Sequence, residues 1–175
     1  MIHTKSPASS LEPAPSPIRL SGLAPVINAT THTLILGSFP GVASLAAQQY
    51  YGFKHNQFWR LLSAILQQDL TVLPYPDKLV CLLAHGIGIW DTYRSCYREG
   101  SLDTAIRQGD LNDFASLQTH HPALQTICFN GKAATKVLQQ MRAWGYQTHV
   151  LPSSSPAHAS LRFEDKLALW RQAFA

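Results

Sequence analysis

Short apolar runs alternate along the chain with longer segments whose apolar residues recur at helical spacing. Four of the runs have the length and composition of strands: Thr33–Gly37, 87–90, 126–129 and Gln147–Leu151. The first is continuously apolar, as expected of a strand that is covered on both faces. Strands that alternate with helices are typical of a parallel sheet between helical layers. The pattern therefore predicts an α/β fold, a three-layer α/β/α sandwich with a central, mainly parallel four-stranded sheet.

Four helices are predicted between and after these strands. One begins near Asn56, one spans 76–85 and stops at Gly86, and one spans 132–141. The last is marked by apolar residues at helical spacing over 163–174.

The composition indicates one folded domain. Of the 175 residues, 46% are hydrophobic and 14% are charged, which fits a compact chain with a sizeable core. Residues 1–19 are rich in Pro and Ser, and we predict a flexible leader there, ahead of a single domain over 20–175. No segment approaches the roughly 20 apolar residues of a membrane span, and the N-terminus lacks a secretory pattern. We expect a soluble, cytoplasmic protein that does not bind membranes.

Net charge and cysteine content do little to distinguish between classes of function. The formal net charge of +4 fits a polyanion-binding protein, but an enzyme with a neutral substrate carries such a charge equally well. The three cysteines, Cys81, Cys96 and Cys128, are widely spaced and form no C-x-x-C pair. We expect reduced thiols and no metal site.

The most unusual loops of the sequence each follow a predicted strand. They begin at Ser38, Asp91, Asn130 and Pro152. In a parallel sheet the carboxyl ends of all strands lie at the same edge, and open α/β sheets bind their ligands outside that edge. We therefore expect these four loops to form one site.

The first of these loops is Gly37-Ser38-Phe39-Pro40-Gly41. Its two glycines and proline allow a tight turn that aims backbone N–H groups at an anion or a carbonyl oxygen. The same turn is also a common structural connection between a strand and a helix, so the sequence leaves both interpretations open.

An aromatic and amide-rich stretch, 48–59, precedes the first strong helix. Aromatic rings suit stacking on a flat base, and amides suit hydrogen bonds to its edge. Alternatively, Phe58 belongs to the core and Asn56 caps the helix. Tyr50 and Tyr51 lie outside any helical stripe, which favours a binding role for them.

The last strand leads into the rigid polar loop 152–158, which contains three consecutive serines. Its hydroxyl and backbone N–H groups suit phosphate contacts, although serine-rich loops are more often only solvated. A small serine hydrolase that pairs one of residues 153–155 with His158 is a further alternative, but no G-x-S-x-G elbow accompanies it.

Taken together and in this order, the motifs resemble the uracil-DNA glycosylase superfamily, and most closely its hypoxanthine-DNA (deoxyinosine) glycosylase branch. The resemblance covers nearly everything from Leu20 to the C-terminus. The matching segments are GSFPGVASL at 37–45, QQYYG at 48–52, NQFW at 56–59, GIGIWD at 86–91, GSLD at 100–103, FNGKAA at 129–134 and LPSSSPA at 151–157.

This resemblance implies a DNA repair enzyme that flips a deaminated base out of DNA and hydrolyses its N-glycosidic bond, leaving an abasic site. Hypoxanthine is the expected base, with uracil and xanthine as alternatives. Many members place a water-positioning Asp or Asn just before the proline of the first motif, where this chain has Phe39. Asn56 matches the important asparagine of the hypoxanthine branch, so we expect it to be catalytic by orienting water or the base.

The resemblance also implies how the base is held. Tyr51 matches the aromatic residue on which the flipped base stacks, and Asp91 matches a polar residue that faces the base edge. The expected base-binding residues are Gly37, Ser38, Phe39, Pro40, Gly41, Tyr51, Asp91 and Asn130.

The motifs that contact DNA depart from the superfamily pattern. Ser153 replaces a histidine of the uracil enzymes, and Ala157 stands where they carry a leucine wedge. The branch's His-Pro-Arg-Asn run reads Phe-Lys-His-Asn over 53–56, which moves the basic contact to Lys54 or His55. The expected DNA-binding residues are Ser44, Lys54, His55, Ser153, Ser154, Ser155, Pro156, Ala157 and His158.

An asparagine amide does not titrate, so Asn56 can position water but cannot act as a general base. Negative charge moves onto the base as the glycosidic bond breaks, so preorganised donors should supply most of the rate. The candidates are the backbone N–H groups of 38–41, with Asn130 as a helper. We expect a monomeric, monofunctional DNA-deoxyinosine glycosylase that needs no metal and no cofactor. A uracil-preferring enzyme of the same fold, or a module that binds damaged bases without cleaving them, remains an alternative.

Overall fold

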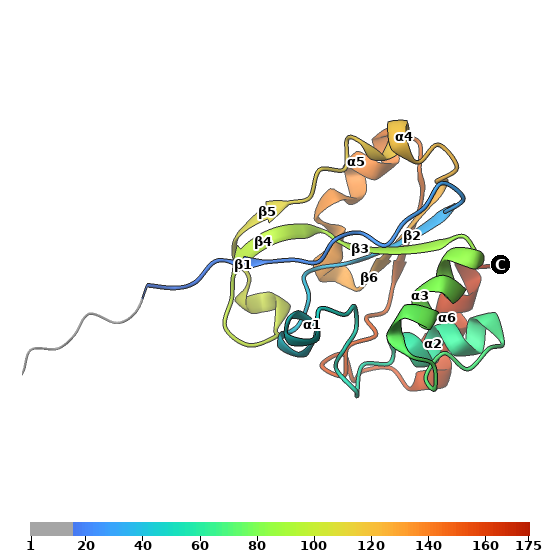
Figure 1. The fold of residues 1–175 in the computed structure, drawn as a ribbon, viewed down its shortest axis with the longest axis horizontal. Helices are drawn as coiled ribbons and strands as arrows, with labels where there is room; N and C mark the ends of the chain where they lie inside the picture. Colours follow the sequence, from blue (N-terminus) through green and yellow to red (C-terminus); the bar gives the residue numbers. More distant parts are fainter. Residues whose placement is uncertain (1–15) are drawn as a thin grey trace, which may run out of the picture.

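Four parallel strands, in the order β3, β2, β6, β7, form the central sheet of the protein (Figure 1). The computed structural model describes residues 16–175, so most of the leader expected over 1–19 lies outside the described residues. The strands are β2 (Thr33–Gly37), β3 (Ile87–Asp91), β6 (Thr126–Asn130) and β7 (Gln147–Leu151). The predicted strands and their parallel arrangement are confirmed.

Helices cover both faces of this sheet because the strand side chains alternate between two apolar clusters (Figure 1). Ile35 and Cys128 point into one cluster, and Leu34, Leu36 and Phe129 into the other. The first face is covered by α2 (Phe58–Leu66), α3 (Tyr75–Ala84) and α6 (Phe163–Gln172). The second is covered by α4 (Leu117–His120), the 3₁₀ helix η2 (Lys132–Val137) and α5 (Leu138–Ala143). The three-layer sandwich is therefore confirmed.

One predicted helix differs in kind from the expectation. The segment 132–141, expected as a single α-helix, begins as the 3₁₀ helix η2 and becomes α-helical only in α5. The Thr135 hydroxyl donates to the Lys132 carbonyl three residues earlier, at 2.7 Å, and the Ala134 N–H donates to the Gly131 carbonyl at 3.3 Å. These three-residue spacings fit the tighter helix.

A second, antiparallel sheet lies beside the carboxyl edge of the main one and was not predicted. It consists of β1 (Leu20–Ser21), β4 (Tyr93–Tyr97) and β5 (Arg107–Leu111), in the order β1, β4, β5. β5 is polar and largely exposed, and β4 is half-buried but mixes tyrosines with polar residues, so neither has the apolar run that identifies a strand in sequence. Two short elements complete the fold, α1 (Val42–Ala47) and the 3₁₀ helix η1 (Asp103–Ala105).

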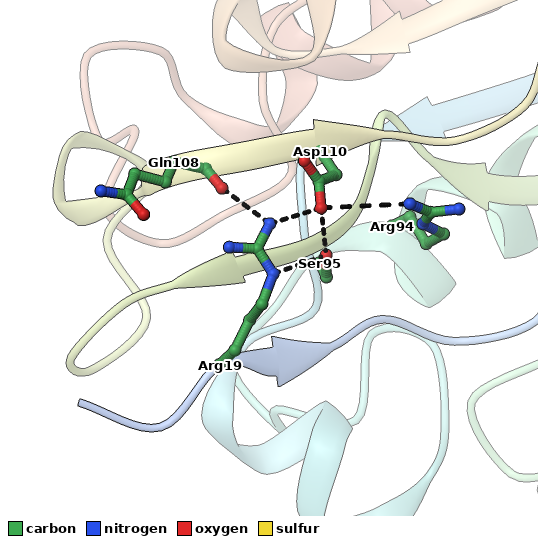
Figure 2. A network of polar contacts seen from close by, with 5 residues as sticks. All are labelled: Arg19, Arg94, Ser95, Gln108 and Asp110. Carbon is green, nitrogen blue, oxygen red and sulfur yellow. Dashed lines mark hydrogen bonds and ion pairs between the residues drawn. The ribbon is translucent and has the colours of Figure 1, made fainter. Parts of the chain in front are cut away.

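A polar network on the small sheet joins the residue before β1 to strands β4 and β5 (Figure 2). The Arg19 guanidinium donates to the Asp110 carboxylate at 2.5 Å, to the Gln108 carbonyl at 2.9 Å and to the Ser95 hydroxyl at 3.1 Å. Arg94 approaches the same carboxylate at 3.9 Å. This network fixes the chain entering β1 against β4 and β5. None of the helices within 16–175 has the length and apolar character that a membrane crossing needs.

Stability should depend far more on the core than on this exposed network. We expect Phe129→Ala, in a fully buried position, to lower the free energy of unfolding by about 3–5 kcal/mol. Asp110→Ala should lower it by less than about 1 kcal/mol, because exposed ion pairs are screened by water. Urea unfolding followed by circular dichroism measures both, and equal losses would contradict this ranking.

Candidate active site

A cavity of about 500 Å³ opens at the carboxyl edge of the central sheet. It has the size typical of pockets that bind small molecules. The cavity brings together Asn56 and every residue expected to bind the base, together with most of those expected to contact DNA. Its predicted lining residues are Gly37, Ser38, Phe39, Pro40, Gly41, Ser44, Tyr51, Asn56, Asp91, Asn130, Ser153, Ser154, Ser155, Pro156 and Ala157.

Gly37 allows the cavity to form because it has no side chain. It is the last residue of β2 and pairs with Asp91, the last residue of β3. A Cβ atom at Gly37 would lie 2.4 Å from the Asp91 Oδ1 atom and 3.2 Å from the Tyr51 hydroxyl. Any larger residue would therefore displace the two side chains that meet there.

The turn after β2 presents backbone donors. The N–H groups of Ser38, Phe39 and Gly41 have no acceptor among residues 16–175. The Phe39 ring is buried, with the Arg98 guanidinium 5.1 Å from its centre. Arg98 also donates to the carbonyl groups of Pro40 and Gly100, so it clamps the turn against the β4–β5 connection. Sequence reasoning did not identify Arg98, because a buried structural arginine has no local motif.

Tyr51 is held in a fixed orientation beside the cavity. Its backbone has a φ of 54°, in the left-handed region, and its ring stacks on Phe58 with centroids 3.7 Å apart and planes 11° from parallel. Its hydroxyl accepts a hydrogen bond from the Asn130 amide at 3.0 Å. Burial, followed by the charge of Asp91, raises the pKa of Tyr51 above its ordinary range. The ring is therefore neutral and preorganised.

Tyr50, in contrast, is a structural residue. It is buried in the core, and its hydroxyl donates to the Ala24 carbonyl at 2.8 Å. Its backbone N–H donates to the Tyr75 hydroxyl at 3.0 Å. Of the two adjacent tyrosines, only Tyr51 thus presents a polar group to the site's hydrogen-bond network.

Asn56 lines the cavity and also binds the start of α2, although the N-cap residue of that helix is Gln57 and not Asn56, as one interpretation of the sequence had it. Its Oδ1 atom accepts the Phe58 N–H at 3.0 Å. Because that N–H can only donate, it fixes which end of the amide faces the helix. The Nδ2 group has no acceptor within 16–175, and Oδ1 retains a second lone pair. The bond to the Phe58 N–H therefore leaves the Asn56 amide able to take part in the site.

Asn130 connects two loops across the cavity floor. Its Nδ2 group donates to the Tyr51 hydroxyl at 3.0 Å and to the Ser154 hydroxyl at 2.9 Å, and its Oδ1 atom accepts the Ser154 N–H at 2.9 Å. Both ends of the amide are thus occupied. Asn130 positions Tyr51 and the loop after β7.

Two of the serines expected to contact DNA have their hydroxyl groups turned inward. Ser154 is 1% exposed and bonds to Asn130, and Ser44 is buried and accepts the Gly52 N–H at 3.0 Å. Both hydroxyl groups therefore shape the loops in this structure. A direct DNA contact by either side chain stays a prediction.

The remaining residues expected to contact DNA lie at the mouth of the cavity or outside it. Pro156 and Ala157 are exposed at the mouth, and Ser153 and Ser155 accept N–H groups of their own loop. Three residues do not line the cavity: Lys54 and His55, which are exposed, and His158, which is half-buried.

The loop after β7 is held in place by α6. The Trp170 indole N–H donates to the Pro152 carbonyl at 2.9 Å, and the Lys166 ammonium donates to the Gln57 amide oxygen at 2.8 Å. The Gln57 N–H in turn donates to the Ser154 carbonyl at 2.9 Å. Lys166 is buried, which lowers its pKa. It was not identified from the sequence, where it appears as one more lysine on an amphipathic helix.

The side chains of the loop after β7 are not arranged as a serine hydrolase requires. The His158 ring lies 3.3 Å from the Ser160 hydroxyl, and within 16–175 no hydrogen bond joins it to residues 153–155. A nucleophile activated by histidine needs such a bond.

Asp91 is a buried carboxyl group in the site. It is 5% exposed, and its Oδ2 atom has no hydrogen-bond partner among the described residues. Burial, assisted by the charge of Asp103 and opposed by that of Arg98, raises the pKa of Asp91 to about 7. Near neutral pH the group is therefore divided between an acid that can donate and a carboxylate that cannot.

The connection between β4 and β5 adds three lining residues that were not assigned to the site from the sequence: Ser101, Leu102 and Asp103. The Ser101 hydroxyl accepts the Val42 N–H at 2.9 Å, and the Ser38 hydroxyl donates to the Asp103 carboxylate. The available signal was the GSLD segment, which matched the superfamily motifs without a residue role attached.

Comparison with known proteins identifies the family of this chain. The family model of the uracil DNA glycosylase superfamily matches residues 24–174. The chain belongs to the uracil DNA glycosylase superfamily. A hypoxanthine DNA glycosylase of Methanosarcina barkeri is 39% identical over 157 residues, which cover 90% of this chain and 99% of that protein. A hypoxanthine DNA glycosylase of Methanosarcina acetivorans is 42% identical over 137 residues, covering 78% and 87%.

A solved structure of this superfamily has the same fold. It is the solution NMR structure of a Methanosarcina acetivorans protein provisionally described as a uracil DNA glycosylase, with a TM-score of 0.79 and 37% identity, and the match covers 90% of this chain and all of that one. The family, fold class and enzyme class expected from the sequence are confirmed. Within 16–175, no three His, Cys, Asp or Glu side chains are grouped as metal ligands would be.

Asn130→Ala should destabilise this glycosylase fold. The substitution removes three hydrogen bonds and leaves the buried Ser154 N–H unpaired, so we expect a loss of about 2–4 kcal/mol in the free energy of unfolding by urea. Gln118→Ala, which removes one exposed bond to the Trp144 carbonyl, is the matched control and should cost less than about 1 kcal/mol. Equal losses would show that Asn130 does not join the loops.

Asp91→Asn should stabilise the fold increasingly as pH rises. Between the ordinary pKa of 3.8 and about 7, folded Asp91 holds a proton that the unfolded chain releases, so wild-type stability falls with rising pH. The advantage of the variant in unfolding free energy should grow by about 2–3 kcal/mol between pH 5 and pH 8. Asp69→Asn is the control: its hydrogen bonds to Thr71 lower the pKa of that exposed carboxyl, so its difference should be flat over this range. A flat difference for Asp91→Asn would mean that its carboxyl is ordinarily ionised.

Proposed function

We propose that the protein is a monofunctional DNA-deoxyinosine glycosylase, which removes hypoxanthine from DNA by hydrolysing its N-glycosidic bond. The observation that carries the proposal is the convergence of Tyr51, Asn56, Asp91 and the N–H groups after β2 on one cavity. The two curated relatives named hypoxanthine DNA glycosylase support the choice of base.

The everted base fits between aromatic and polar groups of the cavity. Phe58 covers one face of the Tyr51 ring, and the base stacks on the other. Asp91, in its protonated form, donates a hydrogen bond to an acceptor on the purine edge. Its Oδ2 atom, which has no partner within 16–175, is the group available for that bond.

The reaction needs charge stabilisation more than acid–base chemistry. Water adds to C1′ of the deoxyribose, the C1′–N9 bond breaks, and its electron pair moves onto hypoxanthine, which takes up a proton while the water loses one. The N–H groups of Ser38, Phe39 and Gly41 stabilise the negative charge that develops on the base. Asn56 orients the water through its amide, and it does so without accepting a proton.

DNA is held around the mouth of the cavity. Lys54, His55 and His158 supply basic or polar contacts from outside the lining, and the exposed loop at Pro156 and Ala157 borders the duplex. Phosphate contacts offset the cost of extruding the base. We propose that the enzyme acts as a monomer in the cytoplasm and needs no metal or other cofactor.

A substrate panel tests the function. Purified protein is incubated in EDTA with duplexes that contain deoxyinosine, deoxyuridine or deoxyxanthosine, and alkali then cleaves any abasic site. Strand cleavage is expected chiefly with deoxyinosine. Preference for deoxyuridine would favour the uracil enzyme suggested by the name of the solved neighbour. Binding to deoxyinosine DNA without single-turnover cleavage would leave a non-catalytic module, and either result would overturn the proposal.

The role of Asn56 is tested by separating its hydrogen bond to the Phe58 N–H from its proposed bond to the attacking water. Asn56→Ala should lower the single-turnover rate at least ~100-fold, as expected when the attacking water is no longer held in position, with little change in the Kd for DNA. Asn56→Ser keeps an oxygen that can cap the Phe58 N–H but has no amide. It should restore thermal stability without restoring turnover. Recovery of turnover in Asn56→Ser would mean that Asn56 serves only as a cap.

A further inference from the structure

A base that leaves a duplex creates a gap in the stack, and proteins that bend or open DNA commonly fill such gaps with an apolar side chain. In this chain Ala157 offers only a methyl group at the exposed loop after β7. An apolar side chain that fills this gap would therefore have to come from another part of the cavity mouth.

Three large apolar side chains at the cavity are exposed to solvent: Val42, Phe53 and Leu102. Leu102 is the most exposed, at 60%, compared with 46% for Phe53. The Phe53 ring already packs edge-on against His55, with centroids 5.3 Å apart. Val42 is shorter and branched at Cβ, with its backbone in the first turn of α1. Leu102 is thus the best placed of the three to reach out of the protein.

The backbone around Leu102 is rigid although its side chain is exposed. On one side, the Ser101 hydroxyl binds the Val42 N–H at 2.9 Å, and on the other Ser38 binds Asp103. The Leu102 carbonyl also accepts the Ala105 N–H at 3.0 Å, which starts η1 beside α1 (Figure 1). An exposed leucine on a fixed backbone gains nothing in the free protein, but it can insert without the added cost of ordering its backbone.

We propose that Leu102 is the wedge of this enzyme, inserting into the duplex where the hypoxanthine nucleotide has left the stack. This inference rests on the proposed deoxyinosine glycosylase function. It places the wedge on the connection between β4 and β5, whereas the loop after β7 keeps the small residue Ala157. Asp103, bound to Ser38, then ties the wedge directly to the turn that contacts the base.

Leu102→Ala distinguishes a wedge from a structural residue when duplex and single-stranded deoxyinosine DNA are compared. The variant should lose roughly 10- to 100-fold in kcat/KM on the duplex, the equivalent of one buried leucine side chain. It should change little on the single strand, which has no stack to hold open. Leu102→Met should recover most of the duplex activity. Leu169→Ala, an exposed leucine on α6 that does not line the cavity, is the matched control.

A second measurement is independent of turnover. In an Asn56→Ala background, 2-aminopurine placed beside the deoxyinosine should brighten on binding as the stack opens, and Leu102→Ala should abolish that increase. Equal losses on both DNA forms, or unchanged fluorescence, would overturn the assignment of Leu102. A duplex-specific loss with Phe53→Ala instead would move the wedge to Phe53. Failure of the wild type to release hypoxanthine from either DNA form would instead defeat the proposed function itself.

Discussion

The side-chain amide of Asn130 is the interaction on which the geometry of the site depends. It extends from the end of β6 and binds Tyr51, 79 residues earlier, and Ser154, 24 residues later. An amide suits this position because it donates at one end and accepts at the other. Tyr51 and the loop after β7 are consequently both positioned by the carboxyl end of β6, a central strand buried on both faces.

The same edge of the sheet also carries buried charged groups, whose loss of water opposes folding. Asp91 is buried beside a glycine that leaves room for it, and Asp103 adds a second negative charge nearby. Arg98 offsets part of this cost while its own guanidinium loses water. The arrangement is unfavourable for folding and suitable for a site, because a carboxyl group that titrates near neutrality can donate a hydrogen bond that an ordinary carboxylate cannot.

Much of this architecture could be predicted from the sequence because its signals are local. Continuous apolar strands such as Thr33–Gly37, and the turn residues that follow them, identify both the parallel sheet and the edge where ligands bind. The antiparallel sheet could not be predicted in this way, since its strands are polar and pair through contacts distant in sequence. Arg98, Lys166 and Leu102 could not be assigned to the site from the sequence for a related reason. Their importance arises from burial or exposure, which depends on the folded chain.

The attachment of the loop after β7 to α6 has a consequence for synthesis of the protein. Trp170 and Lys166, which hold that loop through Pro152 and Gln57, are translated after all four strands of the central sheet. The sheet can assemble earlier on the ribosome, because all four of its strands precede residue 152. A nascent chain can therefore form the central sheet first, and the loop after β7 that borders the cavity is held in place only when α6 has emerged.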